Sequence, residues 1–358
     1  MLITALLIFF GLLTLSSATA VKAYEETGNS YFFVRQQILR GFLPGLFAFL
    51  VLIRLPYQWL KKGNWLWLAA TYFLLLIVFV PGLSLTINGS QSWLVIGGVA
   101  VQTSEIAKLT FIIYLALWFE SKHDEIRDLK KTFIPFILLT GSVCFLLMLQ
   151  PDMGTMAIFF SVSLLMYLTA GMKLTHLALV LSGAGAIFAA LIKIAPYRLQ
   201  RLLTFINPDN DPLGAGYQVK QALIAIGSGG LFGVGLGQSR QKFDYLPEVA
   251  ADSIFAVFAE EWGFFVSIIF VLLYALLFLR GQKIAKRSKD LFAKLLVTGI
   301  IGWITIQSLV NIGAISGILP LTGLPLPFVS LGGSNLAVVM AAMAIVLGIS
   351  RQSTVMKQ

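Results

Sequence analysis

The sequence has few charged residues and almost none of the residues that build disulfides or metal sites. Charged side chains make up 12% of its 358 residues, against about a quarter in ordinary soluble domains. The one cysteine excludes a disulfide framework, and the two histidines lie too far apart in sequence to suggest a metal site. Apolar residues make up 58% of the chain, with a mean hydropathy of +0.87. A soluble fold could not bury this much apolar surface, so the composition predicts an integral membrane protein.

Nucleotide-binding motifs are also missing. The glycine runs at 227–230 and 233–237 lack the Lys-Ser/Thr pair of a P-loop, and no G-x-G-x-x-G pattern occurs. We expect these glycines to form tight turns or close packing in a re-entrant or interfacial segment. The net charge of +10 does not indicate nucleic-acid binding, because the aromatic residues lie within apolar runs rather than beside basic clusters.

Long apolar runs occupy most of the chain. A membrane-spanning helix needs about 20 such residues, so the sequence predicts an all-α polytopic membrane protein with residues 1–358 as a single transmembrane helical domain. The first run ends in Ala18-Thr19-Ala20, which resembles a signal-peptide cleavage site, but no basic residue precedes it, so we assign it as a span. The ten predicted spans are 2–20, 36–55, 63–81, 104–120, 132–149, 153–171, 174–196, 253–279, 291–316 and 335–350.

Basic residues are distributed unevenly between the two sides of these spans. With the N-terminus in the cytoplasm, 15 Lys and Arg residues lie in cytoplasmic connections or the tail, and 6 lie on the other side. The positive-inside rule therefore predicts that both termini are cytoplasmic. It also predicts that the large connection between spans seven and eight is extracytoplasmic.

That connection, residues 197–252, stands out by its length. Connections this long are usually functional or disordered, and recurring apolar pairs argue against disorder. It contains five of the six outside basic residues: Arg198, Arg201, Lys220, Arg240 and Lys242. They either extend beside the membrane without further role, or form a cationic surface for an anionic headgroup or a diphosphate.

Several carboxylates lie at or inside the predicted spans. Glu105 and Lys108, three residues apart, are expected to pair within the bundle and to line a cavity. Asp152 and Asp252 each precede a span, where a carboxylate can cap the helix and where the helix dipole favours its charged form. On this reasoning Asp252 would be only a weak base.

Two further glutamates, Glu260 and Glu261, lie two turns into the span that follows Asp252. Glu260 points within about 80° of Asp252 on a helix. This spacing allows a proton path, an ion site or a catalytic base, and does not choose among them.

Residues 311–333 form a second irregular segment, rich in proline and glycine and without charge. Irregular backbone at membrane depth is tolerated only where it is buried or lines a cavity. Together with the long connection, we expect it to wall an outward-facing cleft, with Asp152, Trp93 and Ser330 as further substrate-binding candidates.

Several stretches resemble the shape, elongation, division and sporulation (SEDS) family. They occur in family order over most of the chain and are the following: Asn88–Trp93, Gln102–Glu105 with Lys108, Gln150–Thr155, Asn207–Tyr217, Gly227–Gly230, Phe243–Glu261, Asn311–Gly313 and Leu319–Ser330. The compact termini resemble the RodA branch of this family more than the FtsW branch.

The resemblance implies a peptidoglycan glycosyltransferase that polymerises lipid II on the outer face of a bacterial plasma membrane. It implies that Asp252 is the essential residue, as general base on the acceptor 4-hydroxyl, with undecaprenyl diphosphate as leaving group. Cations at the site, basic side chains or a divalent ion such as Mg or Mn, would stabilise that diphosphate. Cell-wall elongation would be its role, and a class B penicillin-binding protein its partner.

The chain departs from the family pattern at two places. Ala250-Ala251 precede Asp252 where the family often has His-Thr, and Gln91-Ser92 replace a usual basic pair, with Thr103 where proline is common. The roles that those side chains would have in other family members, including a phosphate contact from the basic pair, are therefore not expected in this chain. Two other functions stay open: a lipid II flippase, and a non-catalytic scaffold for a transpeptidase.

Overall fold

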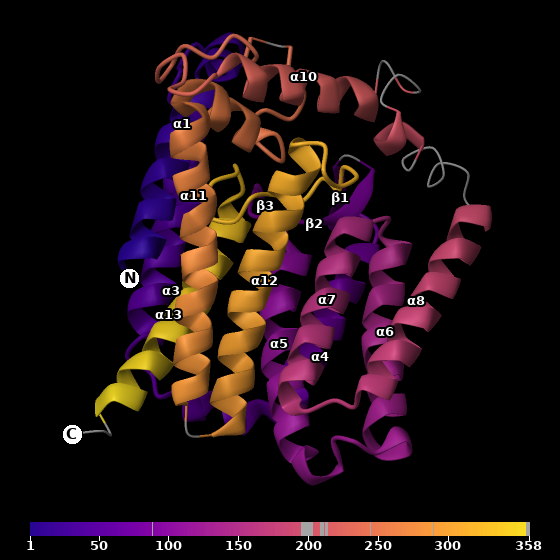
Figure 1. Cartoon of the computed structure of the whole chain (residues 1–358). Helices are drawn as coiled ribbons and strands as arrows, with labels where there is room; N and C mark the ends of the chain where they lie inside the picture. The colour runs from indigo at the N-terminus through magenta and orange to yellow at the C-terminus, as the bar shows by residue number, and fades with distance from the viewer. Residues whose placement is uncertain are drawn as a thin grey trace.

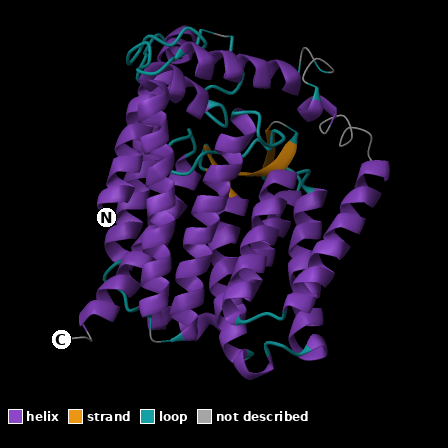
Figure 2. Ribbon diagram, viewed as in Figure 1, coloured by secondary structure: helices purple, strands orange, loops and turns teal. Residues whose placement is uncertain are grey.

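The chain folds into a bundle of long helices that is covered at one end by a short crossing helix (Figures 1 and 2). The computed structural model describes residues 1–87, 89–194, 203–207, 211, 214–243, 245–288 and 290–355. The main helices are α1 (Leu2–Thr27), α2 (Phe32–Gln37), α3 (Leu43–Leu52), α4 (Asn64–Leu76), α5 (Thr103–Ser121), α6 (Ile134–Leu149), α7 (Met153–Ala170), α8 (Leu174–Ile194), α10 (Ala215–Ser228), α11 (Ile254–Arg287), α12 (Leu291–Ile315) and α13 (Gly333–Val355). Short 3₁₀ and π segments flank several of them, including the π turn Ile38–Phe42 that joins α2 to α3.

The helices confirm the prediction of a polytopic helical membrane protein. Within the described residues, seven helical stretches are long and apolar enough to cross a membrane. The other three predicted spans correspond to α2–α3, α5 and α8. A π turn divides the first, and Glu105 and Lys108 lower the hydropathy of the second. The number of ten therefore stays a prediction.

The central helix of the bundle is α12. Of the residues in its most apolar stretch, 78% are buried inside the protein. It packs against α5, α7, α11 and α13. Gly299 and Gly302 allow the close approach, because a Cβ at either position would collide with side chains of α5 or α7. The core is thus built from helix packing in which small residues let backbones approach.

A three-stranded antiparallel sheet, which the sequence analysis did not predict, lies at the end of the bundle that α10 covers (Figure 2). Its strands are β1 (Ser84–Ile87), β2 (Ser90–Ile96) and β3 (Val99–Gln102). Gly97 and Gly98, both at positive φ, form the two-residue turn between β2 and β3. Gly-Gly between alternating branched residues is a hairpin signal that was available in the sequence.

The predicted long connection contains the helix α10, which lies across the end of the bundle (Figure 1). Its start is fixed by Asp211, whose carboxylate accepts hydrogen bonds from the N–H groups of Gly214 and Ala215 at 3.1 and 2.9 Å. These are donors that a helix start leaves without intrahelical partners. The helix packs mainly on α11 and also on α12.

Helix α11 is interrupted at Gly263 (φ 75°, ψ 179°), whereas the sequence predicted an uninterrupted span there. The glycine-rich segment after α10 inserts its backbone into this break. Val234 N–H donates to the carbonyl of Glu260 at 3.0 Å, and Phe264 N–H donates to the carbonyl of Gly230 at 2.9 Å. The expected close packing of these glycines is thereby confirmed, since a Cβ at Gly233 would overlap the α11 backbone.

Candidate functional site

Asp252 lies just before α11, beneath α10, and is only 7% exposed. Its Oδ1 accepts a hydrogen bond from Nε2 of Gln218 on α10 at 3.0 Å, and the same nitrogen donates to Ser253 Oγ at 2.8 Å. Ser253, not Asp252, is the N-cap of α11, and no side-chain capping bond occurs there among the described residues. The carboxylate is therefore held by another element rather than by the helix it precedes.

Asp152 caps a helix, which is the role that the sequence left possible for both Asp152 and Asp252. It is the N-cap of α7, and its Oδ1 accepts from the N–H of Thr155 at 3.0 Å. The capping interpretation is confirmed for Asp152, and the structure gives it no contact with the Asp252 site among the described residues.

The backbone around Asp252 is held by residues of the predicted segment 311–333, of which 311–315 form the end of α12 and the rest lead on to α13. Asn311 Nδ2 donates to the carbonyl of Asp252 at 2.8 Å and to that of Leu324 at 2.7 Å. Ser330 Oγ donates to the carbonyl of Ala251, and Leu331 N–H donates to that of Ala250 at 2.8 Å. Ser330 itself is 2% exposed, so it supports the site from within rather than facing a substrate.

Burial raises the pKa of Asp252 from 3.8 to about 6, and the nearby charge of Glu248 adds to the effect. The hydrogen bond from Gln218 opposes the shift without cancelling it. This direction is opposite to the expectation of a weak base, because loss of water around the carboxylate raises its pKa. A carboxyl group with this pKa is still mostly ionised at neutral pH and accepts a proton more readily than an exposed aspartate.

The five predicted cations have different positions. Lys220 is exposed on α10, two residues after Gln218, and Arg240 is exposed in the segment before α11. Arg198 and Arg201 lie outside the described residues. Lys242 corrects the prediction: it is 7% exposed, so its ammonium group is not available to a bound diphosphate.

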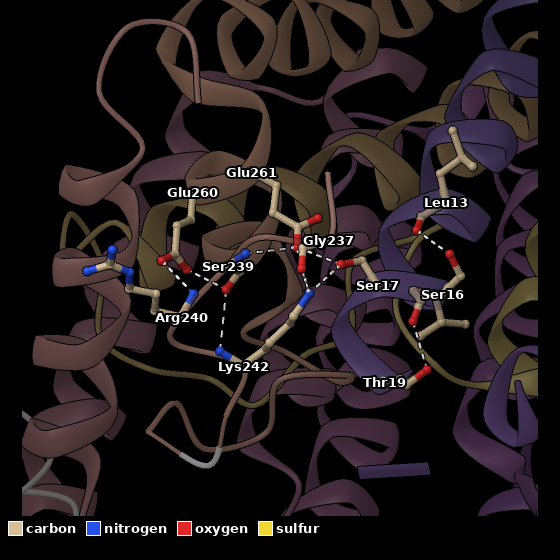
Figure 3. Close-up of polar contacts among 11 residues, drawn as sticks. Leu13, Ser16, Ser17, Thr19, Gly237, Ser239, Arg240, Lys242, Glu260 and Glu261 are labelled. Carbon is tan, nitrogen blue, oxygen red and sulfur yellow. Dashed lines mark hydrogen bonds and ion pairs between the residues drawn. The ribbon is translucent and has the colours of Figure 1, made fainter. Parts of the chain in front are cut away.

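Lys242 belongs instead to a buried polar cluster with the two glutamates of α11 (Figure 3). Its Nζ lies 3.1 Å from Glu261 Oε1 and donates to Ser17 Oγ at 2.9 Å and to the carbonyl of Gly237 at 2.7 Å. Glu260 accepts from Ser239 Oγ and from the N–H of Arg240, at 3.0 Å for the latter. The guanidinium group of Arg240 extends away from this cluster (Figure 3).

The contacts of Glu260 and Glu261 indicate a structural role, which was not among the alternatives left open for them. Both carboxylates are no more than 2% exposed, and both bind the segment 237–242. They therefore hold that segment to α11 and, through Ser17, to α1. This is a structural role in positioning the chain that leads to Asp252.

Glu105 and Lys108 form the predicted buried pair, with Lys108 Nζ 2.8 Å from Glu105 Oε1. Gln307 accepts from the same ammonium at 2.7 Å, and Asn335 donates to the other oxygen of Glu105 at 3.0 Å. The two side chains are 0% and 2% exposed. As expected, Lys108 lines a cavity, which is small and has mainly apolar walls; Glu105 is not among its lining residues.

Trp93 lies half-buried on β2, opposite Leu85 and Gln102 in the sheet. The N–H group of Gln102 donates to Ser334 Oγ at 3.2 Å, which ties the sheet to α13. Trp93 is therefore part of the rim at the covered end of the bundle rather than a direct neighbour of Asp252 in the described contacts.

An apolar groove of about 500 Å³ lies between α10 and the upper part of α11. Its lining includes Ile226, Leu231, Phe255, Ala259 and Val271. Phe255 comes three residues after Asp252, so the groove begins close to the buried carboxylate. A surface of this kind suits a hydrocarbon chain rather than a polar ligand.

Sequence reasoning missed Gln218, because one amide in a long polar connection carries no signal until α10 is recognised as a helix. It also did not single out a role for Glu248. Among the described residues, no group of three or more His, Cys, Asp or Glu side chains could hold a metal ion.

A buried carboxylate at one end of a lipid-embedded helical bundle, held by a crossing helix and an irregular loop, defines a polytopic membrane protein with a polar site near the bilayer surface. The sequence profile of the FtsW/RodA/SpoVE family, described as cell cycle proteins, matches residues 1–355. The chain belongs to this family, which confirms the resemblance found in its motifs.

Individual relatives agree with this assignment. The chain is 39% identical to stage V sporulation protein E of Bacillus subtilis, over 98% of this chain and 96% of the relative. It is 38% identical to a probable peptidoglycan glycosyltransferase FtsW of Thioalkalivibrio sulfidiphilus, over 97% and 87%.

Two solved structures share the fold at 27% identity. One is a chain of a peptidoglycan synthase complex that coordinates polymerization and crosslinking (TM-score 0.81, 98% and 96% covered). The other is the rod shape determining protein RodA of Thermus thermophilus (TM-score 0.71, 98% and 95% covered).

Proposed function

We propose that this protein is a peptidoglycan glycosyltransferase that polymerises lipid II at the extracytoplasmic face, with Asp252 as general base. The observation that carries the proposal is the environment of Asp252: a buried carboxylate with a pKa of about 6, held by Gln218 and Ser253 at the junction of α10, α11 and the 311–333 segment. Family membership and the names of the relatives support the same activity.

In the proposed reaction, ionised Asp252 accepts the proton of the acceptor 4-hydroxyl group. That oxygen forms a bond to the anomeric carbon of the lipid-linked sugar, while the bond from this carbon to the diphosphate oxygen breaks. Undecaprenyl diphosphate leaves with the electron pair, and the proton on Asp252 passes to solvent before the next cycle. A base with a pKa near the working pH serves both the acceptance and the release of the proton.

The remaining parts of the site provide binding. Negative charge develops on the departing diphosphate, and fixed cations lower the energy of such a transition state. Lys220 and Arg240 are the exposed candidates in the described chain, and Arg198 and Arg201 stay predictions. The apolar groove beside Phe255 offers a surface for the polyprenyl tail, which would orient the lipid with its head toward Asp252.

The topology and the partner belong to the same proposal. The basic-residue distribution supports cytoplasmic termini and an extracytoplasmic site. The similarity to a chain of a peptidoglycan synthase complex supports a transpeptidase of the class B penicillin-binding type as partner. The RodA-type role in elongation stays a prediction, because the two relatives compared above are named as a sporulation protein and as an FtsW. Restoration of rod shape in cells depleted of their elongation polymerase would test it.

Purified protein supplied with lipid II, alone and with a transpeptidase partner, tests the activity. We expect glycan strands from the wild type and none from Asp252→Ala. A flippase would instead move fluorescent lipid II across liposomes without making strands. A scaffold would support wall synthesis in cells equally well with Asp252→Asn, so either result would overturn the proposal.

A further inference from the structure

A second cavity lies far from Asp252, beside the last third of α11. Figure 1 shows α11 running from the end covered by α10 toward the opposite end of the bundle. The cavity has a volume of about 520 Å³ and is enclosed by α11, α12, α13 and the first residues of α1. This volume falls within the usual range for ligand sites.

The rim of the cavity is basic, and its floor is apolar. Arg280, Lys283 and Arg287 line it from α11, and Leu277, Ile301 and Met343 are among the apolar residues beneath them. The three cations fall within about 60° of one another around the helix, because they are spaced by three and four residues. They therefore face a single ligand position from one side.

No carboxylate lines this cavity, and the described structure gives none of the three cations an ion-pair partner. The closest acid in sequence, Asp290, is already engaged. Its side chain accepts from Ala293 N–H at 2.7 Å and from Tyr57 at 3.1 Å, and it lies 3.3 Å from Lys61 Nζ. Within the described residues, no carboxylate therefore compensates the positive charge at the rim.

The helix packing around the cavity also has a specific cause. Gly281 lies between Arg280 and Lys283 and is buried, and a Cβ there would collide with Ile301 of α12. The close contact of α11 with α12 holds the cations over the apolar floor. A basic rim above an apolar floor suits the level of the membrane where lipid headgroups meet acyl chains.

We propose that this cavity is a binding site for one anionic phospholipid of the leaflet opposite Asp252. Arg280, Lys283 and Arg287 contact the phosphate of the headgroup, and the apolar floor accepts the upper part of an acyl chain. Guanidinium groups suit this role because they bind phosphate oxygens in a bidentate manner. The site is separate from the proposed catalytic site and does not depend on its chemistry.

Native mass spectrometry of the purified full-length protein in detergent tests the proposal, with phosphatidylglycerol or phosphatidylcholine added stepwise. We expect the first phosphatidylglycerol to bind about tenfold more tightly than phosphatidylcholine. The triple variant Arg280→Gln, Lys283→Gln, Arg287→Gln should lose this preference. Equal binding of the two lipids by the wild type would overturn the proposal.

A matched control removes the same charge elsewhere. Lys62, Lys130 and Lys286 are exposed cations of the same predicted side, and none of them lines the cavity. Their triple substitution by Gln should keep the preference for phosphatidylglycerol. If this control loses the preference as fully as the cavity variant, a diffuse surface charge accounts for binding and the defined site is refuted.

Two further measurements separate a lipid from a free anion and protect the test against misfolding. Glycerol phosphate, which lacks acyl chains, should not displace bound phosphatidylglycerol at equal concentration; displacement would indicate a soluble-anion site instead. Leu347→Trp keeps all three cations but fills the floor, and we expect it to weaken phosphatidylglycerol binding several-fold. Unchanged binding by Leu347→Trp would refute the acyl-chain part of the proposal, even if the triple variant failed to fold.

Discussion

Replacement of Asp252 by asparagine separates its chemistry from its packing. The two side chains have nearly the same volume, and an amide oxygen can still accept the hydrogen bond from Gln218. What is lost is the proton-accepting group, and a positioned general base contributes about 10²–10⁴-fold to a rate. We therefore expect Asp252→Asn to slow polymerisation of lipid II by at least about 100-fold.

The same substitution should make the protein more stable at neutral pH. A pKa raised from 3.8 to about 6 corresponds to about 3 kcal/mol of destabilisation of the ionised folded state. Between pH 3.8 and about pH 6, the folded protein binds more protons than the unfolded chain. Its free energy of unfolding therefore falls as the pH rises through this range and stays low above about pH 6. Asparagine removes this dependence, which gives a gain of up to about 3 kcal/mol at pH 7 and little change near pH 4.

The two measurements together test the reasoning. Strand formation from purified lipid II is followed by gel electrophoresis, and thermal unfolding in detergent is measured at pH 4.5 and pH 7. Lower activity with higher stability at pH 7 is the expected pair of results. Lower activity with lower stability would mean that Asp252 supports the fold, and the assignment as base would be refuted.

Further predictions concern pH, the buried cluster, the α11 break and the helix cap. Polymerisation by the wild type should rise with pH through about 6 and then level off, because only ionised Asp252 accepts a proton; a rate that falls over this range would contradict the proposal. Lys242→Met should lower the free energy of unfolding by about 3–5 kcal/mol, because it leaves Glu261 buried without its cation, whereas Lys242→Met with Glu261→Gln should recover part of the loss in urea unfolding. Gly263→Ala should reduce folded yield in size-exclusion chromatography, because its backbone conformation is nearly restricted to glycine and a Cβ would collide with Gly233. Asp152→Ala should cost about 1 kcal/mol in thermal unfolding through loss of the α7 cap, while Asp152→Asn, which can still cap, should be close to wild type in stability and activity.

The sequence predicted the helical architecture well because each long apolar run needs a helix to satisfy its backbone in lipid. It did not predict the interruption of α11. An apolar run with one glycine is compatible with a continuous helix, and the break depends on backbone hydrogen bonds from a segment about 30 residues earlier. The β2–β3 hairpin did not follow from the apolar runs, because its Gly-Gly turn lies in a connection between two predicted spans.

The site was predictable in part. Irregular backbone at membrane depth must be buried, so the sequence predicted that the 311–333 segment lies against the residues near Asp252. The hydrogen bond from Asn311 to the carbonyl of Asp252 confirms this contact. The role of Lys242 could not be read from composition, because a lysine in a polar connection looks the same whether it faces solvent or a buried glutamate. The fold decides this by placing Glu261 and Ser17 around its ammonium group.

Asp152 and Asp252 show why position in the sequence does not separate a helix cap from a base. Both precede a long apolar helix, and each follows a proline, Asp152 directly after Pro151 and Asp252 five residues after Pro247. Asp152 accepts from a backbone N–H of its own helix, so its carboxylate is fixed for as long as α7 is folded. Asp252 accepts from Gln218, a side chain of a separate helix, which can rotate without unfolding α11. A carboxylate held in this way can exchange a protein donor for a substrate hydroxyl, which is the property that a general base requires.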